Sequence, residues 1–123
     1  MAQRLSRARL INARSGEAIA TDVELALTRS ARRRGLLERD SLDPAAALVL
    51  SPCIAVHTAF MRFAIDVIFV DKAGRVTRVV KHLMPWRVAA SWGAYATIEL
   101  PAGALDRHNI VVGDRLFLTS SRN

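Results

Sequence analysis

The stretch IDVIFVDKAGRVTRVVKHL, residues 65–83, decides the fold. Its first part, Ile65–Asp71, is rich in the β-branched and aromatic residues that favour strands. Lys72-Ala73-Gly74 is typical of a turn, and valines recur in the returning segment, Arg75–Leu83. The stretch is therefore predicted to form a β-hairpin.

The residues before this hairpin predict further strands. Arg7–Ala13 and Glu17–Thr21 surround a tight turn at residues 14–16, which is typical of a second hairpin. Apolar and polar residues alternate along Val23–Leu27, and Ala45–Leu50 is a continuous apolar run. Both patterns predict strands, the second of them buried.

One short helix is predicted between these strands. Thr28 is a suitable N-cap, and Gly35 suits the left-handed position that ends a helix. The helix is expected over Arg29–Arg34, where the arginines near its end favour the negative pole of the helix dipole.

After Pro85 the pattern is weaker, and Trp86–Ala94 has no firm period. Tyr95–Leu100 alternates as a strand, a helical turn is expected through Arg107, and Leu116–Thr119 predicts the last strand. The sum is about seven or eight short strands and two short helices. We expect an α+β, mainly β fold, with a small barrel-like curled sheet.

Length and composition limit the protein class. The 123 residues predict a single domain over 1–123, with flexible ends at 1–6 and 120–123. Hydrophobic residues make up 51% and charged residues 24%, which is typical of a globular chain. No apolar run is long enough for a secretory signal or a membrane span, and the single cysteine forms no internal disulfide. A cytoplasmic protein without a membrane partner is therefore expected.

The formal charge of +7 favours an anionic partner, because positive charge attracts phosphates and carboxylates. The basic residues are spread along the chain, so the excess supports solubility more firmly than nucleic-acid binding. The run Arg32–Arg34 has two interpretations, a phosphate contact or a solvated helix end.

A polar cluster interrupts the apolar segment before the central hairpin. It contains His57, Thr58, Arg62 and Asp66. If residues 60–70 are extended, Arg62 and Asp66 share a face, where burial is costly unless the charges are paired. One interpretation is a structural ion pair. The other is an anion- or hydroxyl-binding pocket, with Arg62 as donor and Asp66 as acceptor.

Glu99, in the run IELPAG, points away from the face that its two apolar neighbours share. It is interpreted either as an exposed strand residue or, with Asp66, as an acid/base carboxylate couple. Cys53 and His57 would lie about 13 Å apart on an extended chain, which disfavours joint metal ligation. No metal site and no cofactor are predicted, and Cys53 is expected to be a small buried hydrophobe.

Aromatic and basic side chains are interleaved in the segment that contains Trp86, Arg87, Trp92 and Tyr95. Such a mixture is found on surfaces that bind single-stranded nucleic acid. Core packing, or self-association through Trp86 and Trp92, is the favoured interpretation.

Four segments in order carry a family resemblance: RRRGLLER (32–39), VHTAFMRFAIDVIFVDKAGRV (56–76), IELPAG (98–103) and VVGDRL (111–116). The chain resembles the domain-of-unknown-function family DUF192, also called UPF0127, over about residues 17–118. The family's central block has Trp-Met-Lys-Asn-Thr, an apolar residue, Pro, Leu and Asp. Met61 and Asp66 match it and Arg62 keeps the positive charge, whereas Phe63-Ala64 stand where the family has Asn-Thr. The resemblance implies a small barrel-like α+β fold and no established activity or cofactor.

The leading hypothesis is a non-catalytic binding module for a small polar or anionic ligand. Its pocket would contain His57, Thr58, Arg62, Asp66 and Glu99. One alternative is a nucleic-acid-binding module that uses the basic surface. The other is a hydrolase-type enzyme that uses Asp66 and Glu99.

Overall fold

The computed structural model describes residues 2–5 and 8–120. In chain order, its elements are β1 (Gln3–Leu5), β2 (Ala8–Asn12), β3 (Ala18–Ala20), β4 (Asp22–Ala26), α1 (Arg29–Arg34), β5 (Ala46–Leu50), β6 (Ala55–His57), β7 (Ile65–Val70), β8 (Val76–Leu83), β9 (Val88–Ala90), β10 (Ala96–Pro101), α2 (Ala104–Arg107) and β11 (Leu116–Ser120). The strands form a six-stranded sheet in the order β1-β4-β5-β10-β7-β8, a three-stranded sheet β11-β2-β3, and the pair β6-β9.

The predicted central hairpin is confirmed and lies at one end of the six-stranded sheet. Ile68 of β7 pairs with Val79 of β8, and on the other side it pairs with Ile98 of β10. Every residue of β7 is buried. A strand that is covered on both faces and paired on both edges is expected to be continuously apolar, as this one nearly is.

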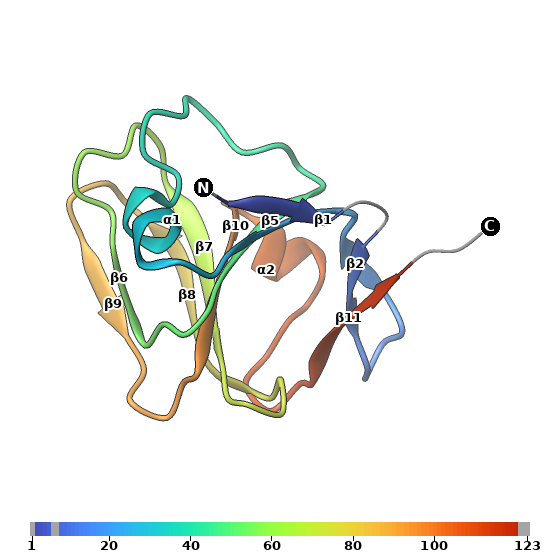
Figure 1. The fold of residues 1–123 in the computed structure, drawn as a ribbon. Coiled ribbons are helices and arrows are strands. Elements are labelled where there is room, and N and C mark those ends of the chain that lie inside the picture. Colours follow the sequence, from blue (N-terminus) through green and yellow to red (C-terminus); the bar gives the residue numbers. More distant parts are fainter. Residues whose placement is uncertain (1, 6–7, 121–123) are drawn as a thin grey trace.

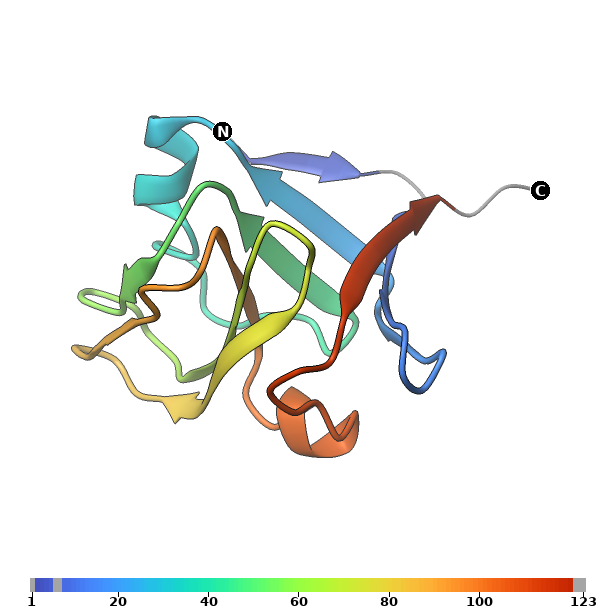
Figure 2. The same ribbon diagram turned by 90° about the horizontal axis from the view of Figure 1, so that it is seen from below.

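The two faces of the six-stranded sheet carry separate hydrophobic clusters. On one face, β2, β3, β11 and α2 pack against side chains that include Ile68, Ile98 and Leu100. On the other face, α1, β6 and β9 pack against side chains that include Leu48 and Val67. Figure 1 shows α1, β6 and β9 on one side of the central strands and β2 and β11 on the other, and Figure 2 again separates α1 from β11.

Most of the predicted elements are found close to their expected bounds. The helix α1 spans Arg29–Arg34 as predicted, and the side chain of Thr28 accepts a hydrogen bond from the backbone N–H of Ala31. Gly35 follows the helix with a φ of 46°. The hairpin predicted over residues 7–21 appears as β2 and β3, although its expected first residue, Arg7, lies outside the described residues.

Other expectations differ from the structure. The barrel-like sheet is not confirmed, because the described strands are divided among three sheets, and the three-residue strands β1, β6 and β9 were not predicted. Of the ends that were expected to be flexible, residues 3–5 form β1 and Ser120 ends β11, while residues 1, 6 and 121–123 lie outside the described part. None of the described helices has the length and apolar character that crossing a membrane requires.

Candidate functional site

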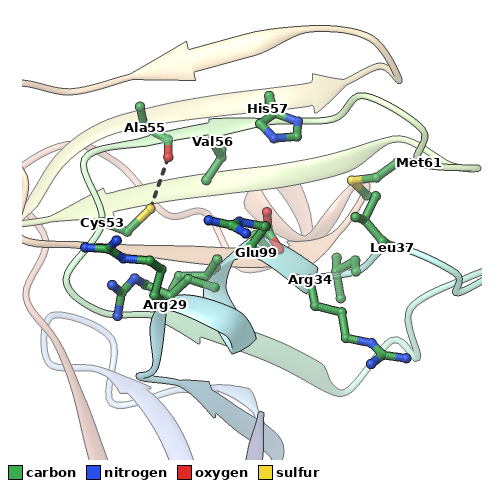
Figure 3. A pocket seen from close by; sticks show the side chains of 14 residues that line it. Arg29, Arg34, Leu37, Cys53, Ala55, Val56, His57, Met61 and Glu99 are labelled. Atoms are coloured by element: carbon green, nitrogen blue, oxygen red, sulfur yellow. Dashed lines mark hydrogen bonds between the residues drawn. The ribbon is translucent and has the colours of Figure 1, made fainter. Parts of the chain in front are cut away.

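A pocket of about 290 Å³ opens on the face of the sheet that α1 covers (Figure 3). Residues of α1 and the segment after it form one wall, and residues 53–61 form the other. Its lining residues are Arg29, Arg32, Arg33, Arg34, Gly35, Leu36, Leu37, Leu50, Cys53, Ala55, Val56, His57, Met61 and Glu99. Of the five residues in the predicted pocket, the structure therefore brings His57 and Glu99 together and leaves out the other three.

Glu99 is the buried charge-bearing group of this pocket. It lies on β10 opposite Leu48 on one side and Val67 on the other, so its side chain shares their face of the sheet. Only 4% of its surface is exposed, and its Oε1 atom has no hydrogen-bond partner among the described residues. Burial raises the pKa of Glu99 to about 7, and the positive charge of Arg39 opposes this rise. The interpretation of Glu99 as an exposed strand residue is therefore wrong.

Four arginines of α1 form the arginine wall of the pocket: Arg29, Arg32, Arg33 and Arg34. Two of them are bound within the protein and two are not. Arg32 donates to the backbone carbonyls of Leu27 and Ser51, and Arg34 forms an exposed ion pair with Glu38. The side chains of Arg29 and Arg33 form no hydrogen bond or ion pair within the described residues, and both residues are exposed. Their guanidinium groups are therefore available to a ligand, and both interpretations of Arg32–Arg34, a phosphate contact and a solvated helix end, stay open.

The opposite wall follows the short strand β6. Cys53 is partly exposed rather than buried, and its thiol donates to the carbonyl of Ala55 at 3.1 Å. His57 is exposed at the other end of β6, and Figure 3 shows Glu99 in the space between this strand and α1. Among the described residues, no three His, Cys, Asp or Glu side chains gather in a metal-binding group.

Arg62 and Asp66 do not meet, which contradicts both versions of the predicted pair. Residues 58–64 turn instead of extending, and exposed Arg62 contacts exposed Asp40 at 2.8 Å. Asp66 is 1% exposed, and its carboxylate accepts backbone N–H groups of His82, Gly103 and Leu105 at 2.8, 3.1 and 2.9 Å. Asp66 therefore joins β7 to β8 and to the start of α2.

The predicted carboxylate couple of Asp66 and Glu99 has no shared cleft. Asp66 pairs with Leu100 in the register of β7 and β10, whereas Glu99 pairs with Val67. Because neighbouring residues of a strand point to opposite faces, the sheet separates the two carboxylates. The geometry does not support a hydrolase that uses both groups.

Thr58 is fully buried and holds backbone together. Its hydroxyl donates to the carbonyl of Met84 at 2.6 Å and accepts from the N–H of Arg87 at 2.9 Å. Trp86 and Trp92 are both exposed, so the interpretation of the two as core aromatics is wrong. Self-association through them stays a prediction.

Comparisons with known proteins agree with the sequence resemblance. The DUF192 family model, described as "Uncharacterized ACR, COG1430", matches residues 10–118. A UPF0127 protein of Thermococcus sibiricus is 33% identical over 112 residues, which cover 87% of this chain and 72% of that protein.

Two crystal structures have a similar fold. One, from Sinorhizobium meliloti, is described as "a putative transcription regulator" and has a TM-score of 0.78 and 25% identity, over 95% of this chain and 93% of that one. The other, a protein of unknown function from Novosphingobium aromaticivorans, has a TM-score of 0.78 and 22% identity, over 89% and 82% of the two chains. The family model and the 33% identical relative place this chain in the DUF192 (UPF0127) family.

Proposed function

We propose that this protein binds a small anionic ligand in the pocket between α1 and β6. The single observation that carries the proposal is the buried Oε1 atom of Glu99, which has no hydrogen-bond partner in a pocket lined by arginines. A buried polar atom without a partner is costly and calls for an explanation. A ligand atom that completes its hydrogen bonding provides one.

The chemistry of the pocket favours an anion. Protonated Glu99 donates a hydrogen bond to an anionic oxygen, and its pKa of about 7 keeps much of it protonated near neutral pH. Arg29 and Arg33 supply positive charge and planar donors that suit carboxylate, sulfate or phosphate groups. The remaining lining includes apolar Val56 and Met61, which lower the local polarity and strengthen these interactions.

Sulfate tests this proposal, because it does not titrate near neutral pH. Calorimetric titration at pH 6 is expected to show binding, and Arg33→Gln is expected to weaken it about tenfold through loss of a charge-assisted hydrogen bond. Arg9→Gln is the matched control, since exposed Arg9 lies on β2 and outside the pocket lining. Equal affinities for the Arg33 and Arg9 variants would exclude the arginine wall as the anion site.

The same titration at pH 8 tests the part played by Glu99. Ionised Glu99 loses its donor and repels the anion, so wild-type affinity should fall as the pH rises through about 7. Glu99→Gln keeps an N–H donor at every pH, so its sulfate affinity should fall less than that of wild type between pH 6 and 8. Both proteins share the other charged groups that face this site, which are Arg29, Arg33 and His57 in the pocket lining and Arg39, whose charge acts on residue 99. The difference between their pH profiles therefore reports Glu99.

Nucleic-acid binding is a second candidate, favoured by the exposed Trp86 and Trp92 with Arg87 close in sequence. The description of the similar Sinorhizobium meliloti structure points the same way. This function predicts retention of single-stranded RNA or DNA that falls steeply with salt, because counterions are released on binding. Retention that is absent, or that is unchanged between low and high salt, would remove this candidate.

A further inference from the structure

An exposed aromatic pair lies on two turns that face each other. The rings of Phe60 and Trp86 meet edge to face, with their centroids 4.6 Å apart and their planes at 60°. Phe60 is 72% exposed and Trp86 is 61% exposed, although large aromatic side chains gain most by burial. The pair therefore leaves ring surface open to solvent.

The backbone beneath both rings has an unfavourable conformation. Phe60 and Trp86 have φ angles of 65° and 66°, in the left-handed region that turns normally fill with glycine. Strain of this kind persists only where the surrounding structure enforces it, and it is concentrated at functional sites. An aromatic residue at one such position is unusual, and here two such residues touch each other.

Buried Thr58 enforces this arrangement. Its carbonyl accepts from the backbone N–H of Met61 and of Trp86, at 3.1 Å in each case, so it closes the first turn and ties the second to it. Its hydroxyl bridges the second turn between Met84 and Arg87. The backbone N–H of Thr58 also donates to the carbonyl of Arg87, so one residue ties the two turns together.

The turns that carry the aromatic pair adjoin the pocket wall along the chain, through two connections. Met61 lines the pocket and directly follows Phe60. His57 also lines it, and His57 pairs with Val88, two residues after Trp86. Both turns are therefore continuous with residues of the pocket wall.

We propose that the ligand of this pocket is a nucleotide, an inference that rests on the proposed anion site. The phosphate binds at Arg29, Arg33 and protonated Glu99, and the base stacks on the Phe60–Trp86 pair. Bases of every kind stack on aromatic side chains, and the guanidinium of Arg87 in the second turn adds positive charge beside them. The nucleotide is either free or part of a single strand, since both present the same phosphate and base.

Calorimetry with inorganic phosphate and with adenosine monophosphate tests this inference. Wild-type protein is expected to bind the nucleotide about tenfold more tightly than phosphate, because stacking contributes to nucleotide binding alone. Phe60→Gly and Trp86→Gly should abolish this difference and leave phosphate affinity unchanged. Glycine relieves the strained φ at both positions, so these variants are expected to fold. Phe117→Ala removes an exposed aromatic side chain on β11, which lies on the other side of the central strands from α1 (Figure 1), and is the matched control.

The outcomes separate the two proposals. Phosphate binding without tighter nucleotide binding would overturn the nucleotide inference and leave the anion site in place. Failure of both ligands, and of sulfate, would overturn the anion site as well. Tighter binding of a short single-stranded oligonucleotide than of the mononucleotide, with loss in the Phe60→Gly and Trp86→Gly variants, would support the inference and assign the nucleotide to a strand.

Discussion

Replacing Asp66 with alanine is expected to lower the free energy of unfolding by about 3–5 kcal/mol, a large part of the stability of a small domain. The carboxylate accepts three backbone N–H groups, from His82, Gly103 and Leu105. Its removal leaves these donors without a partner, and the Leu105 group is in a buried environment. Hydrogen bonds to a charged group are among the stronger ones, so the loss should exceed that of an ordinary surface contact.

Urea unfolding followed by tryptophan fluorescence measures this effect. Asp106→Ala is the matched control, because Asp106 forms only an exposed ion pair with Lys81 and should cost less than about 1 kcal/mol. Asp66→Asn keeps one acceptor oxygen, so its loss of unfolding free energy should lie between the losses for Asp66→Ala and Asp106→Ala. If Asp66→Ala is no more costly than Asp106→Ala, Asp66 is not the structural link that its contacts indicate. Sulfate binding by folded Asp66→Asn should equal that of wild type, since the sheet separates residue 66 from the pocket.

The parts of the fold that local signals specify were predictable. A cap, a run of six residues and a glycine defined α1, and two β-branched runs around a turn defined the β7–β8 hairpin. The strands β1, β6 and β9 have only three residues each, which is too short for a period to be recognised. The strand β3 is equally short, but it was predicted as the partner of β2 across the turn at residues 14–16. Closure into a barrel was not predictable from strand count, because it depends on which edges pair over long sequence distances.

The sequence predicted Glu99 as a site residue but wrongly paired Arg62 with Asp66, because local patterns do not show how distant segments pack. Alternation in β10 correctly placed the side chain of Glu99 on the other face of the sheet from Ile98 and Leu100. Alternation does not show which elements cover each face. The sequence between β6 and β7 looked extended because it is apolar, yet a turn with Phe60 in the left-handed region redirects it. Arg62 consequently lies on the surface with Asp40 instead of beside Asp66. No glycine marks this turn, so the sequence contains no signal for it.

For the arginines of α1, the sequence predicted the helix but not its surroundings. Their helical position was predicted correctly, but whether they contact solvent alone or also line a pocket depends on the segment 53–61 that packs across from them. That packing is non-local, and residues 53–61 contain only one short strand. One sequence signal was available in retrospect: a strand glutamate flanked by apolar residues in a chain with excess arginine.

The stability of the protein is expected to fall as the pH rises from 5 to 8, and Glu99 is the cause. Its folded pKa of about 7 lies above the ordinary value of 4.5, so the folded protein holds this proton more tightly than the unfolded chain does. The stabilising contribution is complete below about pH 4.5, decreases as the pH rises towards 7, and is constant above that. A difference of about 2.5 pH units corresponds to about 3 kcal/mol.

Glu99→Gln isolates this effect, because glutamine has nearly the same shape and does not titrate. Urea unfolding of both proteins at several pH values, in a buffer without sulfate or phosphate, gives the difference in unfolding free energy as a function of pH. All other titrating groups are common to the two proteins, so their contributions largely cancel. Relative to the variant, wild type should lose about 2.5 kcal/mol between pH 5 and 8. Parallel pH profiles would mean that Glu99 is solvated in the folded protein, and the buried, unpartnered carboxyl group on which the anion site depends would then be lost as well.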